Sequence, residues 1–195
     1  MSSNNEIRSE VIFPNYIWTT ELDSSNLVAL KDLAYDLKSK SPGKLISGYG
    51  GWQSDRFKSN LPSELEILAN QIELKVVEIS YKLEIPCPRF GNIWFNINTP
   101  GSYNQIHNHR GSLLSGVYYV DVPSTDCGDI EFHRNDEADY YLHSIMRPGH
   151  AFSSTKLIYP AKTNTLYLFP GWLKHSVQGN KSDKDRISVS FNYGY

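Results

Sequence analysis

The chain has few cysteines and no long apolar run, and both absences exclude classes of protein. It contains only two cysteines, Cys87 and Cys127, which are too few for a disulfide-stabilised scaffold and lack metal-binding spacing. No apolar run approaches the ~20 residues that a membrane-spanning helix needs. Residues 1–10 are polar and lack the apolar stretch of a secretory signal. We therefore expect a cytoplasmic protein that does not enter a membrane.

The chain also lacks an excess of charge of either sign. Its 19 Lys and Arg residues nearly balance 21 Asp and Glu residues, for a net charge of −2. This balance argues against a nucleic-acid partner, which a basic arm or patch would bind. No repeat or Gly/Ser-rich linker divides the 195 residues, and this length predicts one domain. We expect residues 1–88 to form an N-terminal strand and helical support, and residues 89–195 to form a β-rich core.

The first part of the chain carries two helical patterns. Apolar residues recur at helical spacing over 27–37, after possible caps at 23–25, and again over 65–83. Ser63 and Glu66 have the spacing of a capping box at the start of the second helix. We expect a leading strand within 11–19 and a glycine-rich loop over 47–54.

From residue 92 onward the apolar pattern shortens to that of strands. Turn residues separate seven candidate strands, at 92–98, 113–122, 129–133, 156–159, 165–169, 175–177 and 186–193. Short strands after two helices predict a mainly β (α+β) fold, a sandwich or jelly roll, with both N-terminal helices packed on one face. The long connection over 135–154 is typical of either a mobile loop or an active-site lid.

Three of the six histidines are candidates for a metal site. His107 and His109 are two residues apart, so on a strand both imidazoles reach the same side and one metal ion. His175 follows a predicted strand and a Pro-Gly turn that could return it to this pair. A pair of solvent-facing histidines on a loop is the alternative. We interpret His133, His143 and His150 as surface residues or lid contacts.

The last predicted strand places a cation beside hydroxyl groups. Arg186, Ser188, Ser190 and Asn192 alternate with apolar residues and share one face. Polar residues that face water would explain this alternation. A guanidinium beside hydroxyls is also what a bound carboxylate needs, because arginine can bind both of its oxygens.

Seven segments together resemble the Fe(II)- and 2-oxoglutarate-dependent oxygenases. The similarity is to the prolyl-hydroxylase-like branch, and within it to a subgroup often met in marine bacteria and phages. The segments are 50–54 (GGWQS), 94–96 (WFN), 107–110 (HNHR), 114–120 (LSGVYYV), 128–132 (GDIEF), 169–177 (FPGWLKHSV) and 186–192 (RISVSFN). Their order and spacing are specific as a set, although no single segment is.

The resemblance implies a double-stranded β-helix, the jelly-roll or cupin-like fold, with Fe(II) held by His107 and His175. It implies that Arg186 pairs with the distal carboxylate of the co-substrate 2-oxoglutarate. The implied helpers in this contact are Ser188 and one of the adjacent pair Tyr118 and Tyr119, of which Tyr119 matches the position best. Which of the two tyrosines faces the cavity depends on the strand register. Tyr103 and Asn96 are further implied contacts. The implied reaction hydroxylates an unidentified small-molecule or peptide substrate while 2-oxoglutarate is converted to succinate. The sequence does not determine whether the chain forms a homo-oligomer.

One residue departs from the family pattern. The usual metal site has two histidines and an acid two residues after the first, and here that position is His109. We favour His109 as the third ligand of a three-His site. Alternatively, His109 turns away and leaves an open position, as in halogenating relatives, or a carboxylate such as Asp129 or Glu131 substitutes for the acid.

The sequence is also compatible with two other functions. One is a three-His cupin-type oxygenase that does not use 2-oxoglutarate, in which Arg186 would bind a substrate carboxylate directly. The other is a non-catalytic jelly-roll module with a binding or structural role, which keeps the fold and has lost the acid.

Overall fold

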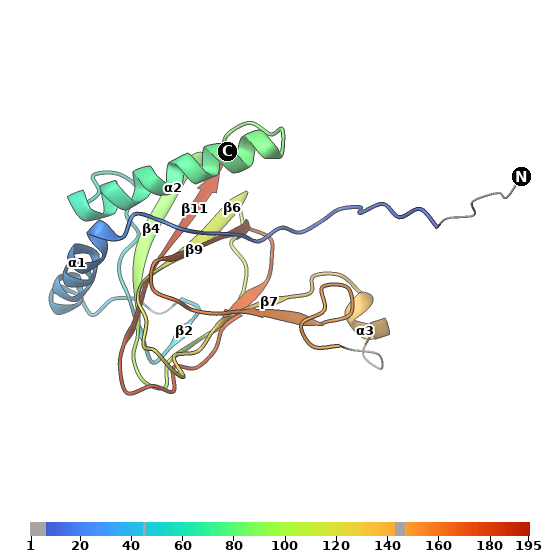
Figure 1. The fold of residues 1–195 in the computed structure, drawn as a ribbon. Helices are drawn as coiled ribbons and strands as arrows, with labels where there is room; N and C mark the ends of the chain where they lie inside the picture. The colour runs from blue at the N-terminus through green and yellow to red at the C-terminus, as the bar shows by residue number, and fades with distance from the viewer. Residues whose placement is uncertain (1–6, 45, 143–146) are drawn as a thin grey trace, which may run out of the picture.

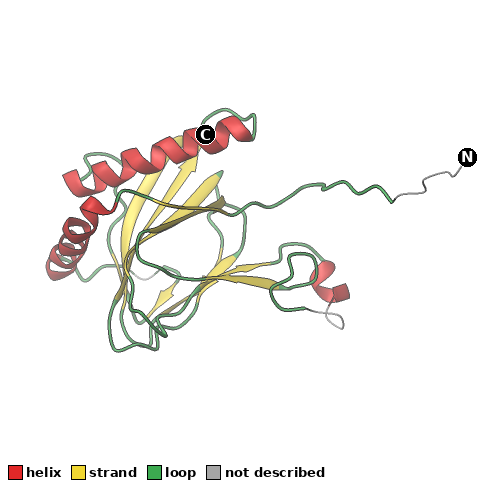
Figure 2. Ribbon diagram, viewed as in Figure 1, coloured by secondary structure: helices red, strands yellow, loops and turns green. Residues whose placement is uncertain are grey.

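The computed structural model describes residues 7–44, 46–142 and 147–195. Two antiparallel sheets face each other, and two long helices lie against the outer face of the larger sheet (Figures 1 and 2). This is the predicted double-stranded β-helix, or jelly roll, with its helices on one face. No described helix is both long enough and apolar enough to cross a membrane.

The larger sheet has six strands in the order β1-β9-β6-β11-β4-β3. Their bounds are β1 Trp18–Glu21, β9 Thr165–Pro170, β6 Leu114–Asp121, β11 Arg186–Gly194, β4 Arg89–Asn98 and β3 Trp52–Gln53. Strand β11 lies between β4 and β6, so both of its edges are hydrogen-bonded. Its side chains therefore sit at the centre of the sheet.

The smaller sheet has five strands in the order β2-β5-β10-β7-β8. Their bounds are β2 Gly48–Tyr49, β5 Tyr103–His107, β10 His175–Val177, β7 Ile130–His133 and β8 Lys156–Tyr159. The predicted bounds of β8 and β10 agree with these. The strand over 103–107 was not predicted, and neither were β2 and β3 in the expected loop.

The helices are α1 Leu27–Lys40, α2 Ser63–Lys82 and the short α3 Ala138–Leu142, with a 3₁₀ turn, η1, at Ser24–Asn26. Asp23 caps this turn, since its carboxylate accepts a hydrogen bond from the Ser25 N–H at 2.9 Å. The capping box predicted at Ser63 does not form, because α2 begins at Ser63 itself. Its N-cap is Pro62, and the Ser63 hydroxyl instead donates to Glu64.

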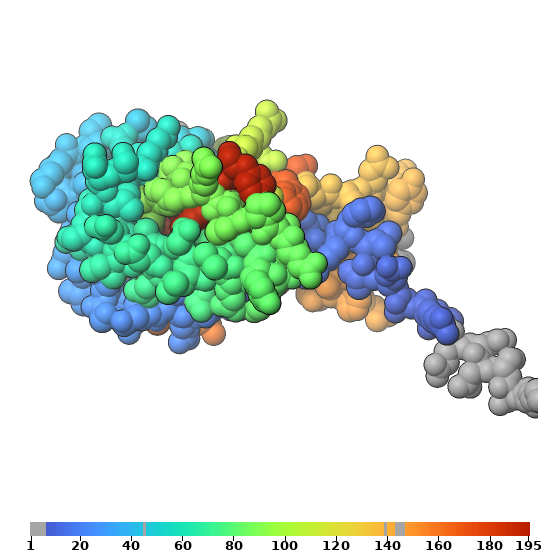
Figure 3. Space-filling view, turned by 90° about the horizontal axis from the view of Figure 1, so that it is seen from above, coloured from blue at the N-terminus to red at the C-terminus, as the bar shows by residue number. Residues whose placement is uncertain are grey.

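The core between the helices and the larger sheet is apolar on both sides. Ile187, Val189 and Phe191 of β11 are fully buried there, in one cluster with Leu68 and Ile72 of α2. Burial of one such side chain stabilises the fold by ~1.5–3 kcal/mol. Figure 3 shows α2 lying across this face beside the C-terminal end of the chain. The helices thereby fix β11, whose opposite face carries the polar residues.

The leading strand is shorter than predicted. Strand β1 begins at Trp18, and the first described residues, from residue 7, extend away from the body of the protein (Figure 1). The connection over 135–154 contains α3 and a series of turns. His143, interpreted from the sequence as a surface or lid residue, lies outside the described residues.

Candidate active site

A cavity of about 380 Å³ lies between the two sheets and is lined by residues of both. The polar face of β11 forms one wall, because Arg186, Ser188, Ser190 and Asn192 all line the cavity. The alternation in β11 therefore separates a helix-facing side from a cavity-facing side. It does not separate a buried side from a solvent-facing side, since three of these four residues are themselves buried.

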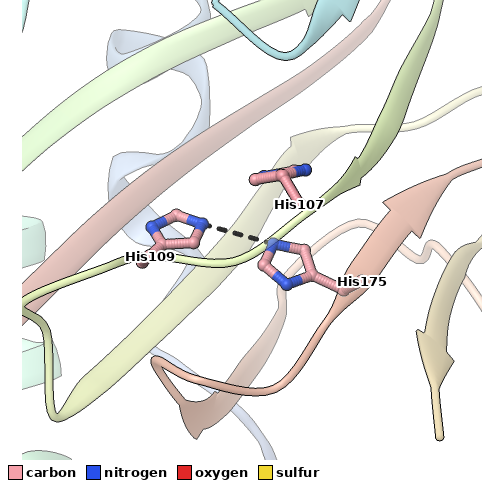
Figure 4. A group of neighbouring side chains, drawn as sticks. All are labelled: His107, His109 and His175. Carbon is pink, nitrogen blue, oxygen red and sulfur yellow. Dashed lines mark hydrogen bonds between the residues drawn. The ribbon is translucent and has the colours of Figure 1, made fainter. Parts of the chain in front are cut away.

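The three candidate histidines converge at this cavity (Figure 4). His107 ends β5 and His175 begins β10, and the two residues are paired across these antiparallel strands. His109 lies beyond the end of β5, where its backbone N–H donates to the Gly171 carbonyl at 2.8 Å. One ring nitrogen from each histidine lies within 4.8 Å of those of the other two.

Every ring has its Nδ1 atom beside an oxygen acceptor. The Nδ1 of His107 lies 2.7 Å from the Gln105 carbonyl oxygen, and that of His175 lies 2.9 Å from the Leu173 carbonyl oxygen. The Nδ1 of His109 lies 2.6 Å from Oδ1 of Asn192. These contacts favour the tautomer with the proton on Nδ1, which leaves each Nε2 lone pair available to a metal.

The spacing of two Nε2 atoms fits a metal ion. Nε2 of His109 and Nε2 of His175 are 3.2 Å apart. A hydrogen bond across this contact, as drawn in Figure 4, needs a proton on one Nε2. In the tautomers described above both Nε2 atoms carry lone pairs, an arrangement that a cation bound by both would stabilise. Two nitrogens bound at right angles to one metal, each ~2.1 Å from it, are about 3 Å apart. The donor set therefore fits the Fe(II) that the resemblance implies.

Burial keeps the three imidazoles neutral. Loss of solvation lowers the pKa of His107, lowers the pKa of His175 well below its usual value, and lowers the pKa of His109 to about 4. The mutual proximity of the histidines lowers the pKa of His109 and His175 further. Neutral imidazole is the form that binds a metal.

Asn192 fixes the orientation of His109 within a network across three strands. Its Oδ1 also accepts a hydrogen bond from the Ser115 hydroxyl at 2.8 Å, and its Nδ2 donates to Asn92 Oδ1 at 3.1 Å. Asn92 and Ser115 are the direct cross-strand neighbours of Asn192 on β4 and β6. The alternation in the sequence places Asn192 on the same face as Arg186, but nothing in the sequence indicates that Asn192 contacts a candidate ligand.

Arg186 is a buried cation in the same cavity. Its side chain is only 1% exposed, and Nη1 donates to the carbonyl oxygens of Cys127 and Gly128, each at 2.5 Å. Gly128 has a φ of 77°, a left-handed conformation that favours glycine. Nη2 of Arg186 is buried without a hydrogen-bond partner among the described residues. A buried guanidinium with an unpartnered N–H group fits a carboxylate ligand such as 2-oxoglutarate.

The other predicted co-substrate contacts divide between the cavity and the surface. Asn96, Ser188 and Tyr119 form one cross-strand row on β4, β11 and β6, and all three line the cavity. Tyr118 points to the opposite face, where its hydroxyl donates to Asn164. Tyr103 does not line the cavity. It stacks on Tyr49 at 5.2 Å between ring centroids.

Neither predicted substitute for the missing acid reaches the histidines. Glu131 bonds with Lys156, Gln178 and Ser176, and an oxygen of Asp129 accepts the Ala161 N–H at 2.9 Å. No carboxylate lines the cavity among the residues that the structure describes. His109 occupies the position of the usual acid and faces the other two histidines.

Comparison with known proteins assigns a family to this arrangement. The model of the family described as "Putative 2OG-Fe(II) oxygenase" matches residues 92–192, just over half of the chain. The chain therefore belongs to this family of 2-oxoglutarate- and Fe(II)-dependent oxygenases, which confirms the predicted enzyme class and cofactors. No curated protein matches the sequence.

Solved structures share the fold at low sequence identity. A Pseudomonas putida prolyl-4-hydroxylase has a TM-score of 0.69 at 12% identity, with 92% of each chain covered. A viral collagen prolyl hydroxylase from Paramecium bursaria Chlorella virus-1 has a TM-score of 0.60 at 18% identity, covering 92% of this chain and 97% of that one. A Trichoplax adhaerens prolyl hydroxylase has a TM-score of 0.66 at 11% identity, covering 91% and 83%. These likenesses confirm the jelly-roll fold.

Proposed function

We propose that this oxygenase holds Fe(II) with three histidines, His107, His109 and His175, and hydroxylates a C–H bond of a small molecule or peptide. The observation that carries the proposal is the convergence of three neutral imidazoles on the cavity that contains a buried arginine. Family membership supplies the reaction class. The chain's own geometry supports the choice of ligands.

Arg186 is the proposed anchor for 2-oxoglutarate. Its Nη2, which has no partner among the described residues, would donate to the distal carboxylate. That carboxylate would also neutralise a buried charge for which the described part of the chain provides no ion pair. Ser188 lies two residues along β11 on the same face, and Tyr119 is the cross-strand neighbour of Ser188. The two hydroxyls are the proposed further contacts, with Asn96 at the end of the row.

The chain's contribution is to bind, orient and neutralise. Bound Fe(II) and 2-oxoglutarate supply the oxidation, in which O₂ oxidises the co-substrate to succinate and CO₂ and hydroxylates the substrate. The cavity walls hold the co-substrate away from bulk water. A third histidine in place of an acid leaves one more positive charge at the metal, which should favour anionic 2-oxoglutarate and weaken metal retention.

An anaerobic titration tests this proposal directly. Metal-free protein is titrated with Fe(II) and then with 2-oxoglutarate, and the weak visible charge-transfer band of the chelate is followed. We expect a band that needs both Fe(II) and Arg186, and succinate formation once O₂ is admitted. Iron binding without the band would favour the three-His cupin-type oxygenase, and no iron binding would favour a non-catalytic module.

Cytoplasmic location and the absence of a nucleic-acid partner remain predictions, and the homo-oligomer stays open. The near balance of charges in the sequence supports the prediction that the protein does not bind nucleic acid.

A further inference from the structure

A stacked arrangement at the cavity links an arginine to the histidine cluster. Cζ of Arg56 lies 4.9 Å from the ring centroid of Trp94, and the Trp94 ring stacks on the His109 ring with centroids 5.9 Å apart and planes 23° apart. The Trp94 ring therefore contacts both the Arg56 guanidinium and the ring of a proposed metal ligand. All three residues line the cavity.

The stack holds Arg56 in one place without occupying its hydrogen-bond donors. A guanidinium over an indole ring is held by cation–π attraction, while its N–H groups point outward in the plane. Among the described residues, the Arg56 side chain has neither an ion pair nor a hydrogen bond. The carboxylate next to it in sequence, Asp55, pairs with Lys44 instead. Arg56 thus presents a prearranged set of donors at the exposed edge of the cavity.

Arg110 adds a second exposed cation to the same cavity lining. It too forms no ion pair among the described residues. Among the described residues, the lining holds three arginines, Arg56, Arg110 and Arg186, and no aspartate or glutamate. Charge at this cavity is therefore positive even though the whole chain carries a net charge of −2.

We infer that the cavity mouth binds the anionic group of the primary substrate, a carboxylate or a phosphate, through Arg56 and Arg110. This inference rests on the proposed function. A divalent metal on three neutral histidines and Arg186 together carry three positive charges, and bound 2-oxoglutarate supplies only two negative charges to them. The charges of Arg56 and Arg110 then remain for the substrate, and guanidinium groups bind carboxylates and phosphates through paired hydrogen bonds.

Calorimetric titration of the loaded protein tests the inference. The protein is first saturated anaerobically with Fe(II) and 2-oxoglutarate, and the chelate band reports that 2-oxoglutarate is bound to the metal. Two matched pairs of probes are then compared, N-acetylglycine against N-acetylglycinamide and glycerol 3-phosphate against glycerol. Arg56→Gln and Arg110→Gln are the test variants. Arg89→Gln removes the same charge from an exposed residue outside the cavity lining and is the control.

We expect at least one anionic probe to bind at least tenfold more tightly than its neutral partner. Each test variant should weaken that binding about tenfold or more, and Arg89→Gln should leave it unchanged. The better of the two anions identifies the substrate group. If the band forms but no anionic probe is preferred, or the test variants bind as the control does, the inference is overturned and the proposed function stands. If no band forms, the proposed function fails, and this inference fails with it.

Discussion

Nδ1 of His109 lies 2.6 Å from Oδ1 of Asn192, a residue 83 positions later in the chain. This contact joins the end of β5 to the central strand of the larger sheet. The amide is held in turn by Ser115 and Asn92 on the two neighbouring strands. The orientation of the His109 ring is therefore set in part by the larger sheet, which packs against the helices.

Asn192→Leu should weaken metal binding, because a leucine side chain cannot accept a hydrogen bond from the Nδ1–H group of His109. Loss of such an outer contact typically costs 10–100-fold in metal affinity. Asn192→Asp keeps an acceptor at this position and should recover much of the loss. The measurement is Fe(II) affinity by anaerobic calorimetry. Asn135→Leu, at an exposed amide outside the cavity lining, is the control. Equal affinities for Asn192→Leu and the unaltered chain would contradict the role of this contact.

His109 itself should behave as a ligand. His109→Ala removes one of three nitrogens and should lower Fe(II) affinity more than tenfold, whereas His109→Asp creates the two-His, one-carboxylate pattern and should bind Fe(II) at least as tightly as the unaltered chain. Metal content after dialysis and a calorimetric titration give the comparison. His150→Ala changes an exposed histidine outside the cavity lining and should have no effect. Retention of full affinity by His109→Ala would show that His107 and His175 suffice.

Local patterns in the sequence were sufficient to predict β10, which carries His175, and β11, which forms the polar wall of the cavity, but not β5, which carries His107. Strands β8 and β10 have their predicted bounds, and β11 extends one residue beyond its predicted end. The alternation of apolar and polar residues in β11 is regular, because one face packs against the helices and the other faces the cavity. The short strands β2, β3 and β5 lie in glycine-rich or polar sequence without clear alternation. These three strands form because they pair with strands that are distant in the sequence, and a single sequence does not reveal which strands pair.

The family resemblance was sufficient to name most of the candidate residues that line the cavity. The contacts that orient these residues could not be predicted, because they depend on tertiary packing. The direction of His109 depends on the Gly171 carbonyl that accepts its N–H and on Asn192. The stack of Arg56 on Trp94 joins β4 to the connection after β3. Both relationships involve residues whose spacing in sequence carries no signal. The choice between Tyr118 and Tyr119 likewise required the register of β6.

Arg186→Gln should abolish tight 2-oxoglutarate binding while Fe(II) affinity changes little. The variant removes a charged donor that is buried in the cavity, and hydrogen bonds to charged groups contribute ~1.5–3 kcal/mol each, or roughly 10–150-fold in affinity. Arg186→Lys keeps the charge but loses the paired geometry, so its affinity should be intermediate. Calorimetry with 2-oxoglutarate on the Fe(II)-loaded protein measures both variants. Arg89→Gln serves as the charge control. Unchanged 2-oxoglutarate affinity in Arg186→Gln would show that another residue binds the distal carboxylate.

The stability of the metal-free protein should fall as the pH is lowered from 7 to 5. Burial lowers the pKa of His109 to about 4 and also lowers the pKa of His107 and His175, whereas unfolded histidine has a pKa of ~6.5. Below that value the unfolded chain binds protons that the folded chain does not, so the free energy of unfolding decreases. For His109 alone the decrease between pH 6.5 and pH 5 is about 2 kcal/mol.

Urea unfolding in the presence of a chelator at pH 7, 6 and 5 measures this slope. The window lies above the range in which most carboxylates titrate, so the histidines dominate the change. His109→Gln should reduce the slope, because the glutamine does not titrate. The exposed His150→Gln should keep the slope of the unaltered chain. Saturating Fe(II) should add to the stability at pH 7 by mass action, and should add less at pH 5, where protons compete for the same nitrogens. A free energy of unfolding that stays level from pH 7 to pH 5 would show that the histidine cluster is solvated in the metal-free protein, and would remove the neutral three-nitrogen site on which the proposed metal centre depends.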